Sequence, residues 1–82
     1  MGTVNYAVIF CYSFDDDVAL YVFNTEEEAK KFLKESYDEE LRIEVEENKF
    51  YAEGYFRDDG LYATITVNHK DITEMRIGKI YQ

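Results

Sequence analysis

Proline is absent from this chain of 82 residues, which also holds only four glycines and a single cysteine. Without proline, a glycine- or serine-rich stretch or an internal repeat, nothing in the sequence divides the chain, and its length suits one domain. The lone Cys11 excludes an internal disulfide framework and a metal site built from several cysteines. We therefore expect residues 1–82 to form a single domain.

Basic residues are also scarce, because nine Lys and Arg face 18 Asp and Glu, which gives a formal net charge of −9. Such a charge disfavours direct binding to nucleic acid or to an anionic membrane, whereas it suits a basic partner. Long apolar runs are missing as well. The stretch Tyr6–Tyr12 has no basic leader and is too short to span a membrane. We therefore expect a cytoplasmic protein.

Apolar and aromatic residues are plentiful, with eight tyrosines and six phenylalanines in a chain that is 46% hydrophobic. The segment Tyr6–Phe14 is apolar on both alternating faces, which is typical of an interior strand covered on both sides. The acidic residues 15–17 interrupt this run, and Val18–Phe23 resumes it. The two segments therefore predict a hairpin with an acidic turn.

A helix is predicted to begin at Asn24-Thr25, because Thr25 and Glu28 match the spacing of a capping box. Apolar residues then follow at helical spacing and form one stripe that can pack on a sheet. These residues are Ala29, Phe32, Leu33 and Tyr37.

The continuation of this segment is ambiguous. Leu41, Ile43 and Val45 alternate with polar residues, which favours a strand beginning at Leu41. Tyr37, Leu41 and Val45 also stand four apart, so a helix that continues to Glu47 is the alternative.

Three further strands are predicted, over Phe50–Phe56, Leu61–Val67 and Ile72–Tyr81. Asp59-Gly60 favours a tight hairpin between the first two, and residues 68–71 turn the chain again. Gly78 marks a predicted bulge, since the alternation of Met75 and Ile77 shifts at Ile80.

The predicted fold is an α+β two-layer sandwich in the order ββ-α-βββ(β), with one helix on one face of a mainly antiparallel sheet of five to six strands. We expect the opposite face of the sheet to carry many of the tyrosines and to offer an aromatic surface to a partner or to a second copy.

The residue types that usually carry catalysis are poorly represented. His69 is the only imidazole and lies in a predicted turn, and Cys11 lies within the most apolar strand, where thiols are commonly inert. Neighbouring carboxylates such as Asp58-Asp59 do not match a calcium loop, and no glycine-rich phosphate loop exists. We therefore expect no enzyme activity, no metal site and no cofactor.

The position of the charge is more informative. Residues 15–59 hold 16 acids and six bases, and residues 35–47 hold seven acids against Arg42 alone, a net charge of −6. If residues 41–45 form a strand, Glu44 and Glu46 stand on one side about 7 Å apart. One interpretation is a solvated face that keeps the protein soluble. The other is a surface that binds a basic partner.

Under the second interpretation, the partner-binding residues are Glu35, Asp38, Glu39, Glu40, Glu44, Glu46 and Glu47, with Asp15, Asp16 and Asp17 as a second patch. Such a row suits a Lys- and Arg-lined groove that normally holds nucleic acid.

Three segments carry a resemblance, namely YAVIFCYSF from Tyr6, NTEEEAKKFL from Asn24 and MRIGKIY from Met75. Taken together they resemble small uncharacterised acidic α+β proteins of Firmicutes and their mobile elements. In size and charge the chain is similar to phage anti-restriction and anti-CRISPR inhibitors, many of which mimic nucleic acid. The resemblance carries over no catalytic residues.

Two functional hypotheses follow. The first is a non-enzymatic acidic protein that inhibits or modulates a nucleic-acid-binding protein by occupying its basic surface. The second is a self-associating scaffold domain, a homodimer for example, that joins through its aromatic sheet face or an open edge strand.

Overall fold

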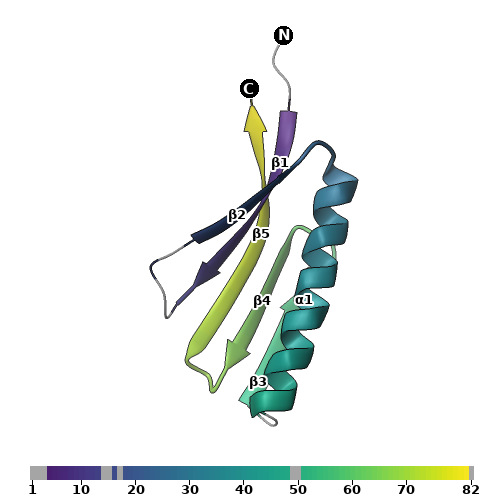
Figure 1. Cartoon of the computed structure of the whole chain (residues 1–82). Helices are drawn as coiled ribbons and strands as arrows, with labels where there is room; N and C mark the ends of the chain where they lie inside the picture. Colours follow the sequence, from purple (N-terminus) through teal and green to yellow (C-terminus); the bar gives the residue numbers. More distant parts are fainter. Residues whose placement is uncertain (1–3, 14–15, 17, 49–50, 82) are drawn as a thin grey trace.

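The computed structural model describes residues 4–13, 16, 18–48 and 51–81. They form a five-stranded sheet with one helix across one face (Figure 1). The elements are β1 (Val4–Tyr12), β2 (Val18–Phe23), α1 (Glu26–Asn48), β3 (Ala52–Phe56), β4 (Tyr62–Val67) and β5 (Asp71–Tyr81). The strand order is β2-β1-β5-β4-β3, and every neighbouring pair is antiparallel. The predicted α+β two-layer sandwich is thus confirmed.

The strand β1 is interior to the sheet, as predicted, but in the described part of the chain α1 covers one of its two faces and not both. It pairs with β2 on one side and with β5 on the other. Val8 and Phe10 are buried, and their register places Phe10 opposite Met75, which is fully buried. Because successive side chains alternate between faces, Ala7 and Ile9 lie on the face away from Val8 and Phe10.

The core lies between α1 and the face of the sheet that carries Val8 and Phe10. It contains Val8, Phe10, Ala29, Leu33, Tyr37, Ala63, Ile65 and Met75. Ala29, Leu33 and Tyr37 stand four apart on α1, so they form one stripe over the sheet. The predicted apolar face of the helix is therefore the buried one.

The start of α1 is fixed by Thr25, as predicted. The Thr25 hydroxyl accepts a hydrogen bond from the Glu28 backbone N–H at 3.2 Å and donates one to the Glu28 carboxylate at 3.0 Å. Glu26, Glu27 and Glu28 occupy the first turn, where negative charge opposes the positive end of the helix dipole.

The predicted strand from Leu41 is wrong, because α1 continues to Asn48. No glycine or proline interrupts residues 37–48, and Leu41 extends the stripe of Leu33 and Tyr37 by another turn. Leu41 packs against the core beside Gly54 of β3, whereas Val45 is exposed. Helical packing of Leu41 therefore overrides the local alternation, and the sheet has five strands.

The turns on either side of β4 lie at their predicted positions. The strands β4 and β5 each differ from their predicted bounds by one residue. Asp59-Gly60 turns the chain between β3 and β4, with Gly60 at φ +75°. The turn before β5 has φ +57° at both Asn68 and His69, residue types that tolerate this conformation better than most. The strand β3 begins at Ala52, and the predicted start at Phe50 lies outside the described residues.

The predicted bulge at Gly78 is wrong. The register between β1 and β5 runs without interruption from Val4 opposite Tyr81 to Tyr12 opposite Thr73. Ile80 therefore lies on the opposite face from Met75 because of ordinary alternation, and not because an extra residue is inserted.

The face of the sheet away from α1 is not the tyrosine-rich surface that we expected. Among the described residues its tyrosines are Tyr55 and Tyr62, whose register with β4 and β5 places them opposite Thr64 and Arg76. At the β2 end the face is aliphatic and carries Val18, Leu20, Val22 and Ile9. The tyrosines on the helix side include Tyr6, Tyr12 and Tyr37, which pack on or belong to the core.

Candidate functional site

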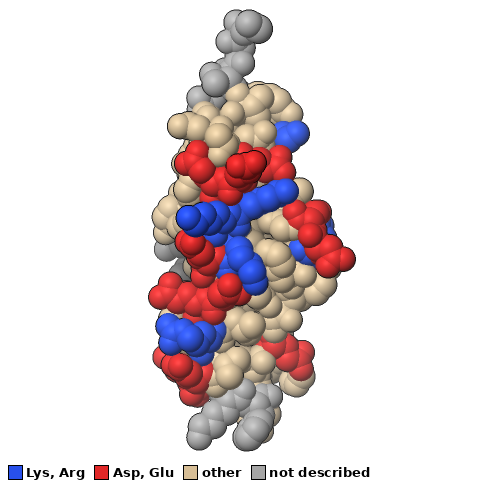
Figure 2. All heavy atoms as spheres, turned by 90° about the vertical axis from the view of Figure 1, so that its right-hand side faces the viewer, with Lys and Arg blue, Asp and Glu red and all other residues tan. Residues whose placement is uncertain are grey.

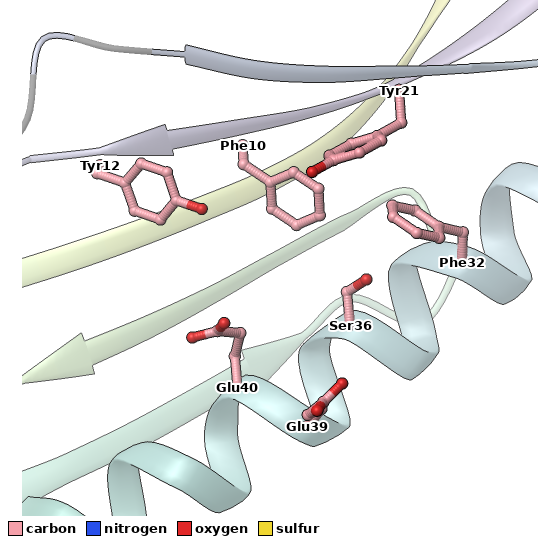
Figure 3. A pocket seen from close by; sticks show the side chains of 7 residues that line it. All are labelled: Phe10, Tyr12, Tyr21, Phe32, Ser36, Glu39 and Glu40. Carbon is pink, nitrogen blue, oxygen red and sulfur yellow. The ribbon is translucent and has the colours of Figure 1, made fainter.

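An open groove of about 160 Å³ lies between α1 and the hairpin of β1 and β2 (Figure 3). It is lined by Phe10 and Tyr12 of β1, Tyr21 of β2, and Phe32, Ser36, Glu39 and Glu40 of α1. Aromatic rings thus face carboxylates across one hollow. We call the side of α1 that carries Phe32, Ser36, Glu39 and Glu40 the groove flank.

The groove exists because the two halves of the sheet offer α1 side chains of different size. In β3, Gly54 has no side chain, and a Cβ there would collide with the Tyr37 hydroxyl and lie 2.9 Å from a Leu41 methyl. The helix can therefore lie close to β3. Under the other side of α1, the rings of Phe10 and Tyr12 are bulky, and the helix axis diverges from β1 (Figure 3). We call the side with Lys34, Tyr37 and Leu41 the β3 flank.

The aromatic wall is a connected cluster of rings. The Phe32 ring centroid lies 5.0 Å from that of Tyr21, 6.1 Å from that of Phe10 and 5.1 Å from that of Phe23. Phe10 and Tyr21 meet edge to face at 5.7 Å. Because these contacts fix Phe32 on α1 against two strands, the wall of the groove is held in place from both layers.

The opposite wall is electronegative. Partial burial is the main reason why the pKa of Glu40 is raised above its ordinary value, and the nearby charges of Glu44, Glu39 and Glu47 raise it further. Glu40, Glu44 and Glu47 follow each other at intervals of four and three residues, so they share one face of α1. A cation beside Glu40 would offset this repulsion.

Two basic residues of α1 pair with acids that do not line the groove. Lys34 binds Asp38 at 3.0 Å, and Arg42 binds Glu46 at 3.3 Å. None of the ion pairs among the described residues involves Glu39 or Glu40. Seen from the side of α1, basic groups separate the acidic ones along the helix (Figure 2). The outer face is therefore mixed in charge, whereas the described residues that line the groove include acids and no base.

The structure places the seven predicted partner-binding residues around the helix and not along one line. Glu35, Glu39 and Glu46 share one side of α1, at spacings of four and seven residues. Asp38 lies beside Lys34, away from the groove. The expected pairing of Glu44 and Glu46 on one side of a strand is wrong, since residues two apart on a helix point about 200° apart.

The second predicted patch is described only in part. Asp16 is exposed in a bend between β1 and β2, and Asp15 and Asp17 lie outside the described residues.

The two residues considered for catalysis lie in different elements, His69 in a turn and Cys11 in β1. His69 is exposed in its turn, as expected. Its place in the most apolar strand predicts that Cys11 belongs to the core, whereas the structure shows it half-buried on the sheet face away from α1. There it borders a shallow hollow with Ser13, Ile72 and Glu74. Within the described ranges no three His, Cys, Asp or Glu side chains gather in a way that could hold a metal ion.

Sequence reasoning found Glu39 and Glu40 but missed the aromatic wall. Phe10, Tyr12, Tyr21 and Phe32 come from three elements, and their meeting depends on how β1 pairs with β2. Phe10 and Tyr12 stand two residues apart, so both rings lie on the same face of one strand. This spacing is the signal that could have indicated half of the wall.

Comparison of the chain with protein-family models, curated proteins and solved structures finds no match. In the part of the chain that the structure describes, no helix is long and apolar enough to cross a membrane.

Proposed function

We propose that this protein is a non-enzymatic acidic binding protein of the cytoplasm that inhibits or modulates a nucleic-acid-binding protein by occupying its basic surface. The partner is a protein with a Lys- and Arg-rich surface, and neither nucleic acid nor a membrane is bound directly. Such a role suits an inhibitor carried by a phage or another mobile element.

The charge of the second half of α1 carries this proposal. Residues 26–34 hold three acids and three bases, so the net charge of −6 on α1 belongs to residues 35–47. At a rise of about 1.5 Å per residue, this is one net charge per about 3.3 Å of helix. One strand of B-DNA carries a phosphate every 3.4 Å or so along its axis. The helix therefore matches the axial charge density of a nucleic-acid strand.

Electrostatic steering would bring the two proteins together. The five strands hold three acids and two bases, so the long-range field comes mostly from α1 and directs a basic surface toward it. Salt screens such a field over about 10 Å at 0.1 M, and we expect binding to weaken as salt rises.

The test is capture of partners on the immobilised protein at 50 mM and 500 mM NaCl, followed by elution with double-stranded DNA. We expect nucleic-acid-binding proteins to be retained only at low salt and to be released by the DNA. A captured set that resists both salt and DNA would contradict the proposal.

Two charge-reversed variants make the test specific. Glu39→Lys with Glu47→Lys changes the groove side of α1, whereas Glu53→Lys with Asp58→Lys makes the same charge change at exposed positions outside α1. We expect the first variant to lose capture and the second to retain most of it. If both variants lost capture equally, capture would depend on the net charge of the protein and not on the position of the acids.

Self-association is a second candidate, because the face away from α1 exposes a row of aliphatic side chains. Val18, Leu20 and Val22 of the edge strand β2 are 57%, 53% and 49% exposed, beside Ile9 of β1. These four residues form what we call the aliphatic face. Since β1 and β2 carry no charged residue, two copies could stack here with both acidic helices outside.

Sedimentation velocity over a range of protein concentrations tests this alternative. A dimer that persists at 500 mM NaCl and dissociates in Leu20→Glu would support it. If the protein sediments as a monomer at all concentrations, self-association is contradicted.

A further inference from the structure

The two edges of the sheet carry strands of different character. The strand order places β2 at one edge and β3 at the other, and in the described part of the chain no strand lies beyond either of them. The strand β3 (AEGYF) contains a charged residue and a glycine. The strand β2 (VALYVF) has no charged residue and no proline, and its register with β1 runs without a bulge. Charges, prolines and bulges are the usual means by which an edge strand avoids pairing with another chain, and β2 has none of them.

The backbone ladder shows which groups of β2 point away from the sheet. Ser13 donates its N–H to the carbonyl of Ile72 at 2.9 Å, and antiparallel pairs alternate, so the odd-numbered residues of β1 bond to β5. The even-numbered residues of β1 therefore bond to β2, opposite Ala19, Tyr21 and Phe23. The residues between these direct their N–H and C=O groups outward, and they are Val18, Leu20 and Val22.

Side chains on both faces of β2 are exposed as well. Val18, Leu20 and Val22 are exposed on the face away from α1, and Tyr21 is exposed on the helix side. A strand that joins this edge would meet backbone donors and acceptors along its length and apolar groups on both of its faces. The strand that fits is therefore uncharged and apolar on both faces.

We infer that β2 pairs antiparallel with β2 of a second copy, with Leu20 of each copy facing the other across a two-fold axis. In this register Val18 faces Val22 of the second copy, and these pairs each exchange two backbone hydrogen bonds. On the helix side the small Ala19 faces the ring of Tyr21. The chain's own β2 is the occupant because it is uncharged and apolar on both faces and brings no like charges together. Self-association thus uses the edge of β2 and not the aliphatic face.

This pairing would place both acidic helices on one face. The two-fold axis of an antiparallel strand pair is perpendicular to the sheet, so both copies of α1 lie on the same side of the joined sheet. Residues 35–47 then occur twice on that side, and the groove that Tyr21 lines lies on the flank of α1 nearer the axis. Here the inference rests on the proposed function, since a basic partner would bind two helices at once and hence more tightly than one.

Sedimentation velocity of the full chain between 5 and 200 µM, at 150 and 500 mM NaCl, measures the dimer. Val22→Pro removes an outward N–H, leaves the bonds to β1 intact and keeps an apolar side chain. Val22→Ala is the matched control, because it shortens the side chain and keeps the N–H. Ile9→Lys disrupts stacking of aliphatic faces but lies in β1, away from the edge. Circular dichroism verifies that each variant is folded.

We expect a wild-type dimer whose share rises with concentration and with salt, since salt screens the repulsion between two chains of net charge −9. Val22→Pro should weaken dimerisation at least about tenfold more than Val22→Ala does, because each copy loses a hydrogen bond. Ile9→Lys should dimerise as the wild type does.

Amide hydrogen exchange of the wild type, followed by NMR, is a second measurement that needs no variant. Exchange at Val18, Leu20 and Val22 should slow as the protein concentration rises, because pairing bonds these N–H groups. Exchange at Ala19 and Tyr21, which already bond to β1, should change less. Exchange at the first three residues that does not depend on concentration would overturn the inference.

The outcomes separate this inference from the other proposals. If Val22→Pro dimerises as Val22→Ala does, or if folded Ile9→Lys is a monomer, the edge pairing is overturned and self-association through the aliphatic face stands. A wild type that is monomeric at 200 µM overturns both forms of self-association. Salt-dependent capture of a basic partner, which tests the proposed function, is measured separately and is contradicted by none of these results.

Discussion

The two flanks of α1 differ in packing and in charge. On the β3 flank, Tyr37 and Leu41 lie directly over Gly54, and Lys34 neutralises Asp38. On the groove flank, large rings hold the strands away from the helix, and Glu39 and Glu40 face the hollow without a basic neighbour among its lining residues. One helix thus has a flank that stabilises the fold and a flank whose charges repel one another.

This difference indicates where the protein retains residues for a purpose other than stability. Partial burial, and after it the charges of Glu44, Glu39 and Glu47, raise the pKa of Glu40, which means that the folded state is destabilised when Glu40 is ionised. A surface that lowers stability is expected at a binding site, where a partner supplies the missing opposite charge.

The largest effect should come from the β3 flank. Tyr37→Ala removes a buried ring whose centroid is 5.3 Å from that of Phe56. We expect a loss of about 3–5 kcal/mol in the free energy of unfolding, measured by urea denaturation. A loss below about 1 kcal/mol would show that the helix does not depend on this flank.

A smaller loss is expected at Gly54. In Gly54→Ala the new methyl group collides with Tyr37 and Leu41, so these side chains or the helix must shift, at a cost of about 1–3 kcal/mol. Gly78→Ala is the matched control, because its Cβ would meet only a methyl of Ile9 at 3.9 Å, an ordinary contact. Equal effects of the two substitutions in urea denaturation would refute the close approach of α1 to β3.

On the groove flank we expect a substitution to raise the free energy of unfolding instead of lowering it. Glu40→Gln removes a like-charge pair with Glu44, and we expect the free energy of unfolding at pH 7 to rise by about 0.2–0.5 kcal/mol. Asp38→Asn instead breaks the exposed pair with Lys34 and should lower it by up to about 0.5 kcal/mol. Thermal denaturation of both variants provides the comparison, and destabilisation by Glu40→Gln would contradict it.

The smallest effect that we expect is in how the free energy of unfolding depends on pH. Because the pKa of Glu40 is raised in the folded state, that state binds the proton first as pH falls from neutrality, so the contribution of Glu40 to stability improves. Asp59 behaves oppositely, since hydrogen bonds from Arg57 and Leu61 lower its pKa and its contribution is lost at still lower pH. Urea denaturation of wild type and Glu40→Gln between pH 7 and pH 3 should show the first effect only in the wild type.

Local sequence signals were sufficient for the start of α1 and for the interior position of β1. Thr25 and Glu28 act on each other within one turn, and the apolar faces of β1 are a property of its own residues. The end of α1 could not be predicted in this way. Residues 41–45 satisfy both a period of two and a helical stripe, and the contact that decides between them is with Gly54 in another element.

The candidate site was predictable only on its charged side. Glu39 and Glu40 belong to an acidic run that is visible in the sequence. Tyr12 and Tyr21 join them because the β1 and β2 register places both rings on the helix side, whereas we had expected the tyrosines on the open face. Pairing between strands is non-local, so composition alone could not assign these rings to a face.

The most direct test of the account is the pKa of Glu40, measured by carboxyl ¹³C NMR titration of the free protein and of the protein with hexa-arginine. We expect a pKa above the ordinary value for glutamate in the free protein, and we expect it to fall when the peptide binds and supplies positive charge. An ordinary pKa in the free protein, or one that hexa-arginine leaves unchanged, would contradict the claim that residues 35–47 of α1 bind a basic partner.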